Sequence, residues 1–301
     1  MIARLRSHLC FVLIGIASLV LFRAPLQAIV SLSLTDNRYS YIVLIPAISA
    51  FTLWLERGRI FSRTAFTPGT GLLCLGSSLA LYAVAQTLHL DLNYRASVNM
   101  LFILLVSAAA FVVSYGVQAL KAAKFSLLLL LLVVPIPSSL MDKIITGLQW
   151  GSAEATFILF KGAGVPMFRD GIKFELPRIG IEIAKECSSI HSACALFITG
   201  LLVGHLFMRT LLAKFCLSVL TVPIAMLTNA VRIVTIWFLA TEVNEGFMYG
   251  DLHRNGGILF SLVSLSILMS FLFLLRKLER RRFGRDEVRT LARVECKKVP
   301  A

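Results

Sequence analysis

Long apolar runs, separated by short polar segments, extend over most of the chain. A membrane-spanning helix needs about 20 consecutive and mostly apolar residues. Eight runs have this character, of which the second is short: 9–30, 41–55, 70–89, 97–117, 123–141, 189–207, 213–240 and 254–275. The hydrophobic pattern therefore predicts an all-α polytopic membrane protein with about eight transmembrane helices.

The longest interruption, residues 142–188, has a pattern of its own. Within 144–160, apolar residues recur at helical spacing, which predicts an amphipathic helix lying along the membrane surface. Within 169–185, apolar and polar residues alternate on both sides of 177–180, which is typical of a β-hairpin. Such a hairpin before the sixth span can cover a site or pair its edge with an extended peptide.

The charge of the chain favours a lipid partner over a nucleic acid. Only 15% of the residues are charged, against about 25% in soluble domains. The net charge is +14, but the lysines and arginines concentrate in short loops beside apolar runs and in the segment 276–301. Anionic headgroups of membrane lipids are therefore the expected counter-charge, and nucleic acid is not expected as a partner. We predict one transmembrane domain, 1–275, followed by a basic cytoplasmic tail, 276–301.

The distribution of basic residues also predicts the orientation of the chain. With the N-terminus in the cytoplasm, 19 of the 30 lysines and arginines fall in cytoplasmic segments, and every short cytoplasmic loop is basic. The outer loop after the seventh span carries Glu242, Glu245 and Asp251 instead. We therefore expect a multi-pass protein of the inner (plasma) membrane, with both termini cytoplasmic and the segment 142–188 extracytoplasmic.

Cys187 differs from the other five cysteines, which read as inert thiols in apolar runs or in the tail. It opens the sixth span, where a thiol faces unpaired backbone N–H groups and the positive end of the helix dipole, so that thiolate is favoured. Ser188 or Ser189 can cap the same helix. A partly wet position at the outer membrane surface suits a nucleophile, although a buried structural cysteine is the alternative interpretation.

Arg232 lies within the seventh span, toward its outer end. A charge there costs on the order of 3 kcal/mol, so it usually faces a cavity and a partner, although an arginine can also extend outward to the interface. Asn229 lies three residues earlier on the same helical face. Two polar groups on one side of an apolar helix favour a site over a chance position.

His253 begins the eighth span, and the predicted topology brings it to the same outer face as Cys187 and Arg232. A thiolate nucleophile, an imidazole that moves protons and a cation that stabilises an oxyanion are the groups that thiol-based acyl transfer needs. The sequence contains no C-x-x-C pair or zinc-ligand spacing, and no P-loop, H-E-x-x-H or G-x-S-x-G motif. We therefore expect no metal and no cofactor.

At these positions the sequence resembles the exosortase/archaeosortase family. Members carry Cys-Ser at the start of a span, Asn-x-x-Arg in the next span, and a histidine with a glycine four residues later at the following one. The matching residues are Cys187-Ser188, Asn229-Ala-Val-Arg232, and His253 with Gly257. Further similarity, in the order of the family, lies at Tyr39-Ser40, Pro46, Trp54, Pro135-Ile-Pro137, Gly164-Val-Pro166 and the stretch from Gly171 to Pro177. The resemblance covers about 35–275.

The resemblance implies a membrane cysteine transpeptidase on an all-helical fold. Its substrates would be secreted proteins that end in a short motif (Pro-Glu-Pro in the bacterial branch), a hydrophobic span and a basic tail. By this resemblance, Cys187 forms a thioester, Arg232 stabilises the oxyanion or the thiolate, and His253 protonates the leaving amine and activates the acceptor. The acceptor, a glycan or a lipid among the options, is left open.

The sequence departs from the family at Ser189 and His191, where members commonly have glycine and then arginine, glutamine or a similar residue. His191 follows Cys187 by four residues on one helical face and so competes with His253 as the base, although His253 is favoured. Three other functions stay open: a transporter or lipid-handling protein, a peptidase that hydrolyses the thioester, and a non-catalytic assembly protein. The first would need ionisable residues deep in the spans, where the sequence has few.

Overall fold

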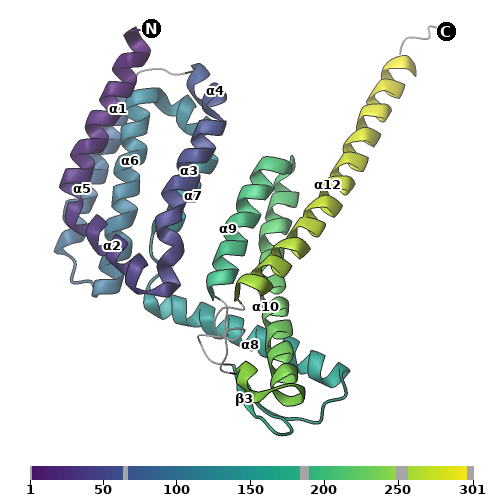
Figure 1. The fold of residues 1–301 in the computed structure, drawn as a ribbon. Coiled ribbons are helices and arrows are strands. Elements are labelled where there is room, and N and C mark those ends of the chain that lie inside the picture. Colours follow the sequence, from purple (N-terminus) through teal and green to yellow (C-terminus); the bar gives the residue numbers. More distant parts are fainter. Residues whose placement is uncertain (1, 64–66, 184–189, 249–256, 297–301) are drawn as a thin grey trace. The chain divides into compact units, whose positions relative to one another are not determined.

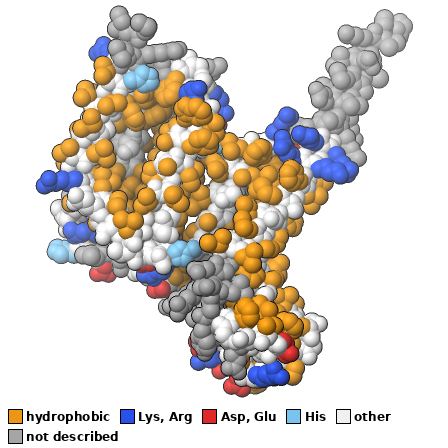
Figure 2. Space-filling view, in the orientation of Figure 1, with side chains coloured by type: hydrophobic (Ala, Val, Ile, Leu, Met, Phe, Trp, Pro, Cys, Tyr) orange, Lys and Arg blue, Asp and Glu red, His pale blue; other side chains and the backbone are white. Residues whose placement is uncertain are grey.

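A computed structural model of the chain describes residues 2–63, 67–183, 190–248 and 257–296, and it is almost entirely helical (Figure 1). By its internal contacts the chain divides into two compact units, Met1–Asp142 and Lys143–Ala301. Hydrophobic side chains are widely exposed on the helices of both units, as the orange atoms of Figure 2 show. An apolar outer surface of this kind belongs in a lipid bilayer, so the protein is embedded in the membrane.

The secondary structure described in the first unit is helical. Its elements are α1 (Ile2–Leu21), α2 (Arg23–Thr35), η1 (Asn37–Val43), α3 (Leu44–Leu55), α4 (Arg57–Ile60), η2 (Phe61–Arg63), α5 (Pro68–Thr87), α6 (Leu92–Ala122), α7 (Lys124–Leu129), η3 (Leu130–Val133) and the first turn of α8 (Ser138–Gly162). Helix α6 lies against α1 and α5. One end of this unit is closed by aromatic rings around Tyr115, whose hydroxyl lies 2.8 Å from His8 Nδ1.

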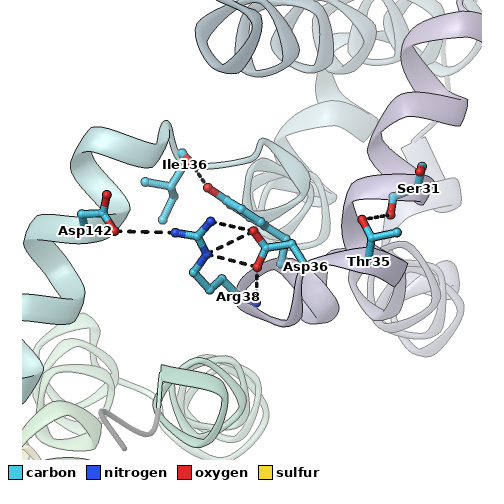
Figure 3. A network of polar contacts seen from close by, with 7 residues as sticks. Ser31, Thr35, Asp36, Arg38, Ile136 and Asp142 are labelled. Atoms are coloured by element: carbon cyan, nitrogen blue, oxygen red, sulfur yellow. Dashed lines mark hydrogen bonds and ion pairs between the residues drawn. The ribbon is translucent and has the colours of Figure 1, made fainter. Parts of the chain in front are cut away.

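A polar network connects the end of α2 to the non-helical segment that precedes α8 (Figure 3). The Asp36 carboxylate accepts hydrogen bonds from Arg38 Nε at 3.1 Å and from Nη2 at 2.7 Å, and Asp142 lies 3.6 Å from Arg38 Nη1. The Tyr39 hydroxyl donates to the Ile136 carbonyl at 2.7 Å. These bonds fix the position at which the chain turns between η3 and α8.

Among the described residues, six helices are long and apolar enough to cross a membrane, and the number reaches eight if each of two bent helix pairs crosses once. The prediction of an all-α polytopic membrane protein is therefore confirmed. Two predicted spans are bent instead of straight: 9–30 is broken between α1 and α2 by 75°, and 123–141 is broken before α8 by 96°. Pro25 cannot donate its helical hydrogen bond back across the first break, and Pro135 and Pro137 lie in the second.

The second unit combines helices with a small sheet. Its elements are the rest of α8, the strands β1 (Phe168–Asp170), β2 (Lys173–Glu175) and β3 (Ile181–Glu182), and then α9 (Ile190–Phe207), α10 (Leu211–Glu242), η5 (Glu245–Met248) and α12 (Gly257–Cys296). The strands pair antiparallel in the order β1-β2-β3, with Phe174 opposite both Arg169 and Ile181. The predicted hairpin around 177–180 is confirmed, with β1 as an additional strand. The predicted helix at 144–160 lies within α8, and its placement at the membrane surface stays a prediction.

Helices α9, α10 and α12 pack around one apolar core. Gly200 of α9 allows a close approach to α10, because a Cβ there would lie 2.7 Å from Thr221 Cγ2. The buried members of this core are Leu196, Met208, Ala213, Leu217, Ile224, Ala225, Leu268 and Leu272. The three helices thus form a bundle in which α10 contacts both of the others.

One carboxylate of α12 joins the three helices at the end opposite the sheet. Glu279 accepts hydrogen bonds from the backbone N–H groups of Arg209 at 3.2 Å and Thr210 at 2.8 Å, and from the Thr210 hydroxyl at 2.5 Å. These donors lie in the short connection between α9 and α10, where helix-initial N–H groups otherwise lack partners. Glu279 therefore fixes α12 to the start of α10.

We predict that Glu279→Gln lowers the stability of the protein, because the neutral amide oxygen is a weaker acceptor and the amide nitrogen accepts nothing. Hydrogen bonds to a charged group contribute about 2 kcal/mol, so the melting midpoint in detergent should fall by several degrees. Glu175→Gln, at an exposed position of β2, is the matched control and should melt as the wild type does. Equal midpoints for both variants would contradict the role of Glu279.

Candidate functional site

The residues predicted to form the site belong to, or directly precede, three helices of the second unit. Cys187 and Ser188, before α9, and His253, before α12, lie outside the residues that the structure describes. His191 in α9, and Asn229 and Arg232 in α10, are described. The geometry of the site is therefore built from the helices and strands that flank these positions.

The chain on both sides of Cys187 is held in place. Ile183, four residues before Cys187, has 1% of its surface exposed; its N–H donates to the Ile172 carbonyl at 3.1 Å, and its carbonyl accepts from Gln149 Nε2 of α8 at 2.8 Å. Helix α9 begins at Ile190, three residues after Cys187. The segment that carries the predicted nucleophile thus starts from the sheet and ends in a helix of the bundle.

The sheet itself is fixed to α8 and to the last turns of α10. Phe174 of β2 and Trp237 of α10 are buried against Phe160 of α8, whose ring centroid lies 6.2 Å from that of Phe174 and 5.1 Å from that of Trp237. Trp237 Nε1 also donates to the Ile179 carbonyl at 3.2 Å. The β2–β3 turn therefore packs directly on the end of α10.

Arg178 makes the second contact between this turn and α10. Its backbone has a φ of 70°, which is uncommon outside glycine. The guanidinium donates to the Thr241 carbonyl at 2.6 Å and lies 3.9 Å from the Glu242 carboxylate. The last carbonyls of a helix lack intrahelical donors and favour a cation, so Arg178 caps α10.

Side-chain hydrogen bonds join the helices that carry the described residues of the predicted site. Ser192 of α9 lies 2.9 Å from Ser261 of α12, and Thr228 of α10 lies 2.7 Å from Ser264 of α12. Asn229 Nδ2 of α10 donates to Ser152 Oγ of α8 at 3.0 Å. We refer to these six side chains as the polar belt: Ser152, Ser192, Thr228, Asn229, Ser261 and Ser264.

The polar belt sets the register of four helices. Inside a bilayer, hydroxyl and amide groups have no water to bind and are satisfied by partners on neighbouring helices. Ser192 and Ser261 lie in the first two turns of α9 and α12, so the starts of these two helices are side by side. Cys187 precedes Ser192 by five residues, and His253 precedes Ser261 by eight.

Arg232 is half-buried on α10, ten residues before the end of that helix at Glu242. It follows Thr228 by one turn, about 6 Å along the axis. Helices α10 and α12 run antiparallel, since Thr210 contacts Glu279 near one end and Thr228 contacts Ser264 further along. Arg232 therefore lies on the part of α10 that is level with the start of α12. Arg232 thus lies in a mostly apolar helix, as the sequence predicted.

Asn229 and His191 differ in exposure. Asn229 is buried, with 3% of its surface exposed, and acts as a donor between helices. His191 is exposed in the first turn of α9, at the rim of a groove of about 540 Å³ between α9 and α12. The assignment of His253 as the base, with His191 as the alternative, stays a prediction.

Sequence reasoning identified Asn229 of the polar belt but missed its other five members. Isolated serines and threonines in transmembrane helices often bond their own helix, and Ser261 and Ser264 do donate to the carbonyls of Gly257 and Phe260. Ser261 and Ser264 are three residues apart and so lie on one face of α12, and this spacing was the sequence pattern that could have predicted a polar contact with a neighbouring helix. The sequence did not indicate which neighbouring helix would contact this face.

Comparison with known proteins identifies the family. Residues 33–270 match the family model described as transmembrane exosortase, which covers most of the 301 residues. The chain belongs to the transmembrane exosortase family. Exosortases in general are membrane cysteine transpeptidases that process sorting signals of secreted proteins. No curated protein and no solved structure matched the chain.

The polar belt yields a prediction about the coupling between α8 and α10. Asn229→Ala and Ser152→Ala should each destabilise the protein, and the double variant should lose less than the sum of both. The coupling energy of such a pair in a membrane protein is about 0.6 kcal/mol and reaches about 1.7 kcal/mol. Unfolding of the four proteins in detergent measures it; strictly additive losses would show that the two side chains do not interact.

Proposed function

We propose that this exosortase is a cysteine transpeptidase that cleaves C-terminal sorting signals of secreted proteins and transfers the new carboxyl end to an acceptor. In this proposal Cys187 is the nucleophile, Arg232 stabilises the oxyanion and His253 moves the protons. The observation that carries it is the polar belt, which keeps the starts of α9 and α12 together and at the level of Arg232 on α10. Cys187 lies three residues before the first residue of α9, and His253 lies four residues before the first residue of α12.

The position of Arg232 supports a catalytic role. A guanidinium within an apolar helix costs on the order of 3 kcal/mol, and such residues are typically functional. The planar guanidinium offers paired donors at a fixed spacing, which suits a carbonyl oxygen that gains negative charge. The adjacent buried Asn229 holds this part of α10 to α8 through Ser152.

The proposed reaction has two steps. The Cys187 thiolate attacks the scissile carbonyl, the C–N bond breaks as His253 donates a proton to the leaving amine, and a thioester remains. An acceptor hydroxyl or amine then attacks the thioester, His253 takes its proton, and the thiolate leaves. Water in place of the acceptor would give hydrolysis by the same groups.

We further propose an inner-membrane protein with cytoplasmic termini, a catalytic domain over 1–275, a basic tail over 276–301 and a site on the extracytoplasmic face. Support comes from the basic side chains where α12 leaves its apolar stretch, seen as blue atoms in Figure 2: Arg276, Lys277, Arg280 and Arg281. Basic residues at a span end favour the cytoplasm and anionic lipids. Arg276 also stacks on Phe207 of α9, 5.5 Å from its ring centroid.

The burial pattern argues against a transporter. Among the described residues, the buried polar side chains are serines, threonines, one asparagine and one glutamine, without a carboxylate or a basic group. A path for ions or polar solutes through a bundle is normally marked by ionisable residues. The polar belt bonds within the protein and so supports a structural framework around a site at one end of the bundle.

Substitution of Cys187 tests the proposal directly. Cys187→Ala should abolish processing of a secreted reporter that ends in a Pro-Glu-Pro motif, an apolar span and a basic tail, while the protein still accumulates in the membrane. Cys187→Ser should retain at most about 1% of the rate, because an unactivated hydroxyl is a poor nucleophile. Cys216→Ala, at an exposed position of α10, is the control and should process normally. Processing by Cys187→Ala would refute the nucleophile and favour a scaffold.

Substitution of Arg232 separates geometry from charge. Arg232→Ala should reduce reporter processing at least 100-fold, and Arg232→Lys should recover only a small part of it, because an ammonium cannot reproduce the paired donors. Pulse-chase rates of processing measure both variants against wild type at equal protein levels. Full activity of Arg232→Lys would show that the charge alone matters.

A further inference from the structure

A groove between α9 and α12 is a feature of the second unit that the proposed chemistry leaves without a role. It has a volume of about 540 Å³ and is open to one side. Its walls run along α9 from His191 to Thr199 and along α12 from Gly257 to Leu265. Eight residue steps of helix correspond to about 12 Å, so the groove follows less than half of a hydrocarbon layer about 30 Å thick.

The floor of the groove is closed by contacts with α10. Leu196 belongs to the apolar core that α10 shares with both helices, and Ser264 is buried and paired with Thr228 of α10. On the open side, Ile258 and Leu262 of α12 have 73% and 57% of their surface exposed. The groove is therefore a lateral depression in the surface of the α9–α10–α12 bundle, with exposed apolar side chains along its open side.

The walls of the groove suit a helix as the occupant. Ala195, Ser192, Ser261 and Gly257 are all small, and small residues allow two helix backbones to approach closely in a membrane. The hydroxyls of Ser192 and Ser261 already bond each other, with Ser192 as the donor because Ser261 donates to Gly257, so the wall does not require water. An apolar helix can thus enter without leaving these two groups unpaired.

We propose that this groove receives the first turns of the hydrophobic span of the substrate's sorting signal. The inference rests on the proposed function, because that function supplies a substrate whose span directly follows the cleaved motif. The groove begins at His191 and Gly257, four residues after Cys187 and four after His253 in the sequence. A span lying in the groove would present its preceding motif at the end where both segments join the bundle. The groove then selects substrates whose first turns are narrow enough to fit.

Filling the groove tests this role. Ala195 is exposed and its side chain carries no hydrogen bond, so Ala195→Leu adds bulk to the wall at little cost to folding. We expect at least a tenfold slower processing of the reporter that carries the Pro-Glu-Pro motif, an apolar span and a basic tail. Ser266→Leu, an exposed position of α12 outside the groove, is the matched control and should change the rate less than twofold.

A rescue distinguishes occupancy from a general structural effect. A reporter whose first two span turns are reduced to alanine should restore processing by Ala195→Leu to within about threefold of wild type. A merely misfolded variant would process neither reporter. Equal processing of the original reporter by wild type and Ala195→Leu would overturn the groove assignment and leave the transpeptidase proposal intact.

Cross-linking tests binding without turnover. A photoreactive benzophenone amino acid is introduced at Leu262, beside the groove, or at Leu274, an exposed position further along α12, in the Cys187→Ala background. We expect a cross-link to the start of the reporter's span from position 262 and not from position 274. Cross-links from position 262 only to lipid, or only to a second copy of this chain, would overturn the inference. If the wild type leaves the reporter unprocessed and no cross-link forms, both proposals fail; a cross-link without processing would retain the groove alone.

Discussion

The second unit depends on one constraint: polar side chains within a membrane protein must find partners inside it, because the lipid offers none. The polar belt meets this constraint with three hydrogen bonds that join α8, α9, α10 and α12. Each bond is weak by itself, but each fixes the height of one helix against another. The apolar core of the bundle supplies attraction between the helices without fixing their register, so the belt determines which helix turns lie at one level.

The broad fold could be predicted from the sequence because bilayer thickness imposes a length on apolar runs, and a strand imposes a period of two. Both signals are local, and both were confirmed in α9, α10 and the β2–β3 hairpin. The bends were missed because hydropathy averages over a window, and a proline inside an apolar run hardly changes that average. Pro25, Pro135 and Pro137 were present in the sequence, but their effect on helix direction is a matter of backbone hydrogen bonding and not of hydrophobicity.

The candidate site was predictable only in the identity of its chemical groups. A cysteine at a helix start or an arginine in an apolar helix is conspicuous because its type is costly or reactive at that place. The supporting residues are ordinary by type: Gln149 bonds a carbonyl of the sheet, and Ser152 accepts from Asn229. Their roles arise from contacts between segments up to 77 positions apart, which a single sequence does not encode in any local pattern.

Ile183 is held by hydrogen bonds to Gln149 and Ile172, so the length of the chain that follows it affects folding stability and reaction rate differently. Six residues connect this anchor to the first residue of α9. Doubling the length of a flexible connection costs only about 0.6 kcal/mol of loop-closure entropy, so folding would tolerate a longer one. In the proposed reaction, however, a longer connection would lower the effective concentration of the Cys187 thiol at the scissile bond. Under the proposed function, insertions between residues 183 and 190 would therefore lower the reaction rate far more than the thermodynamic stability.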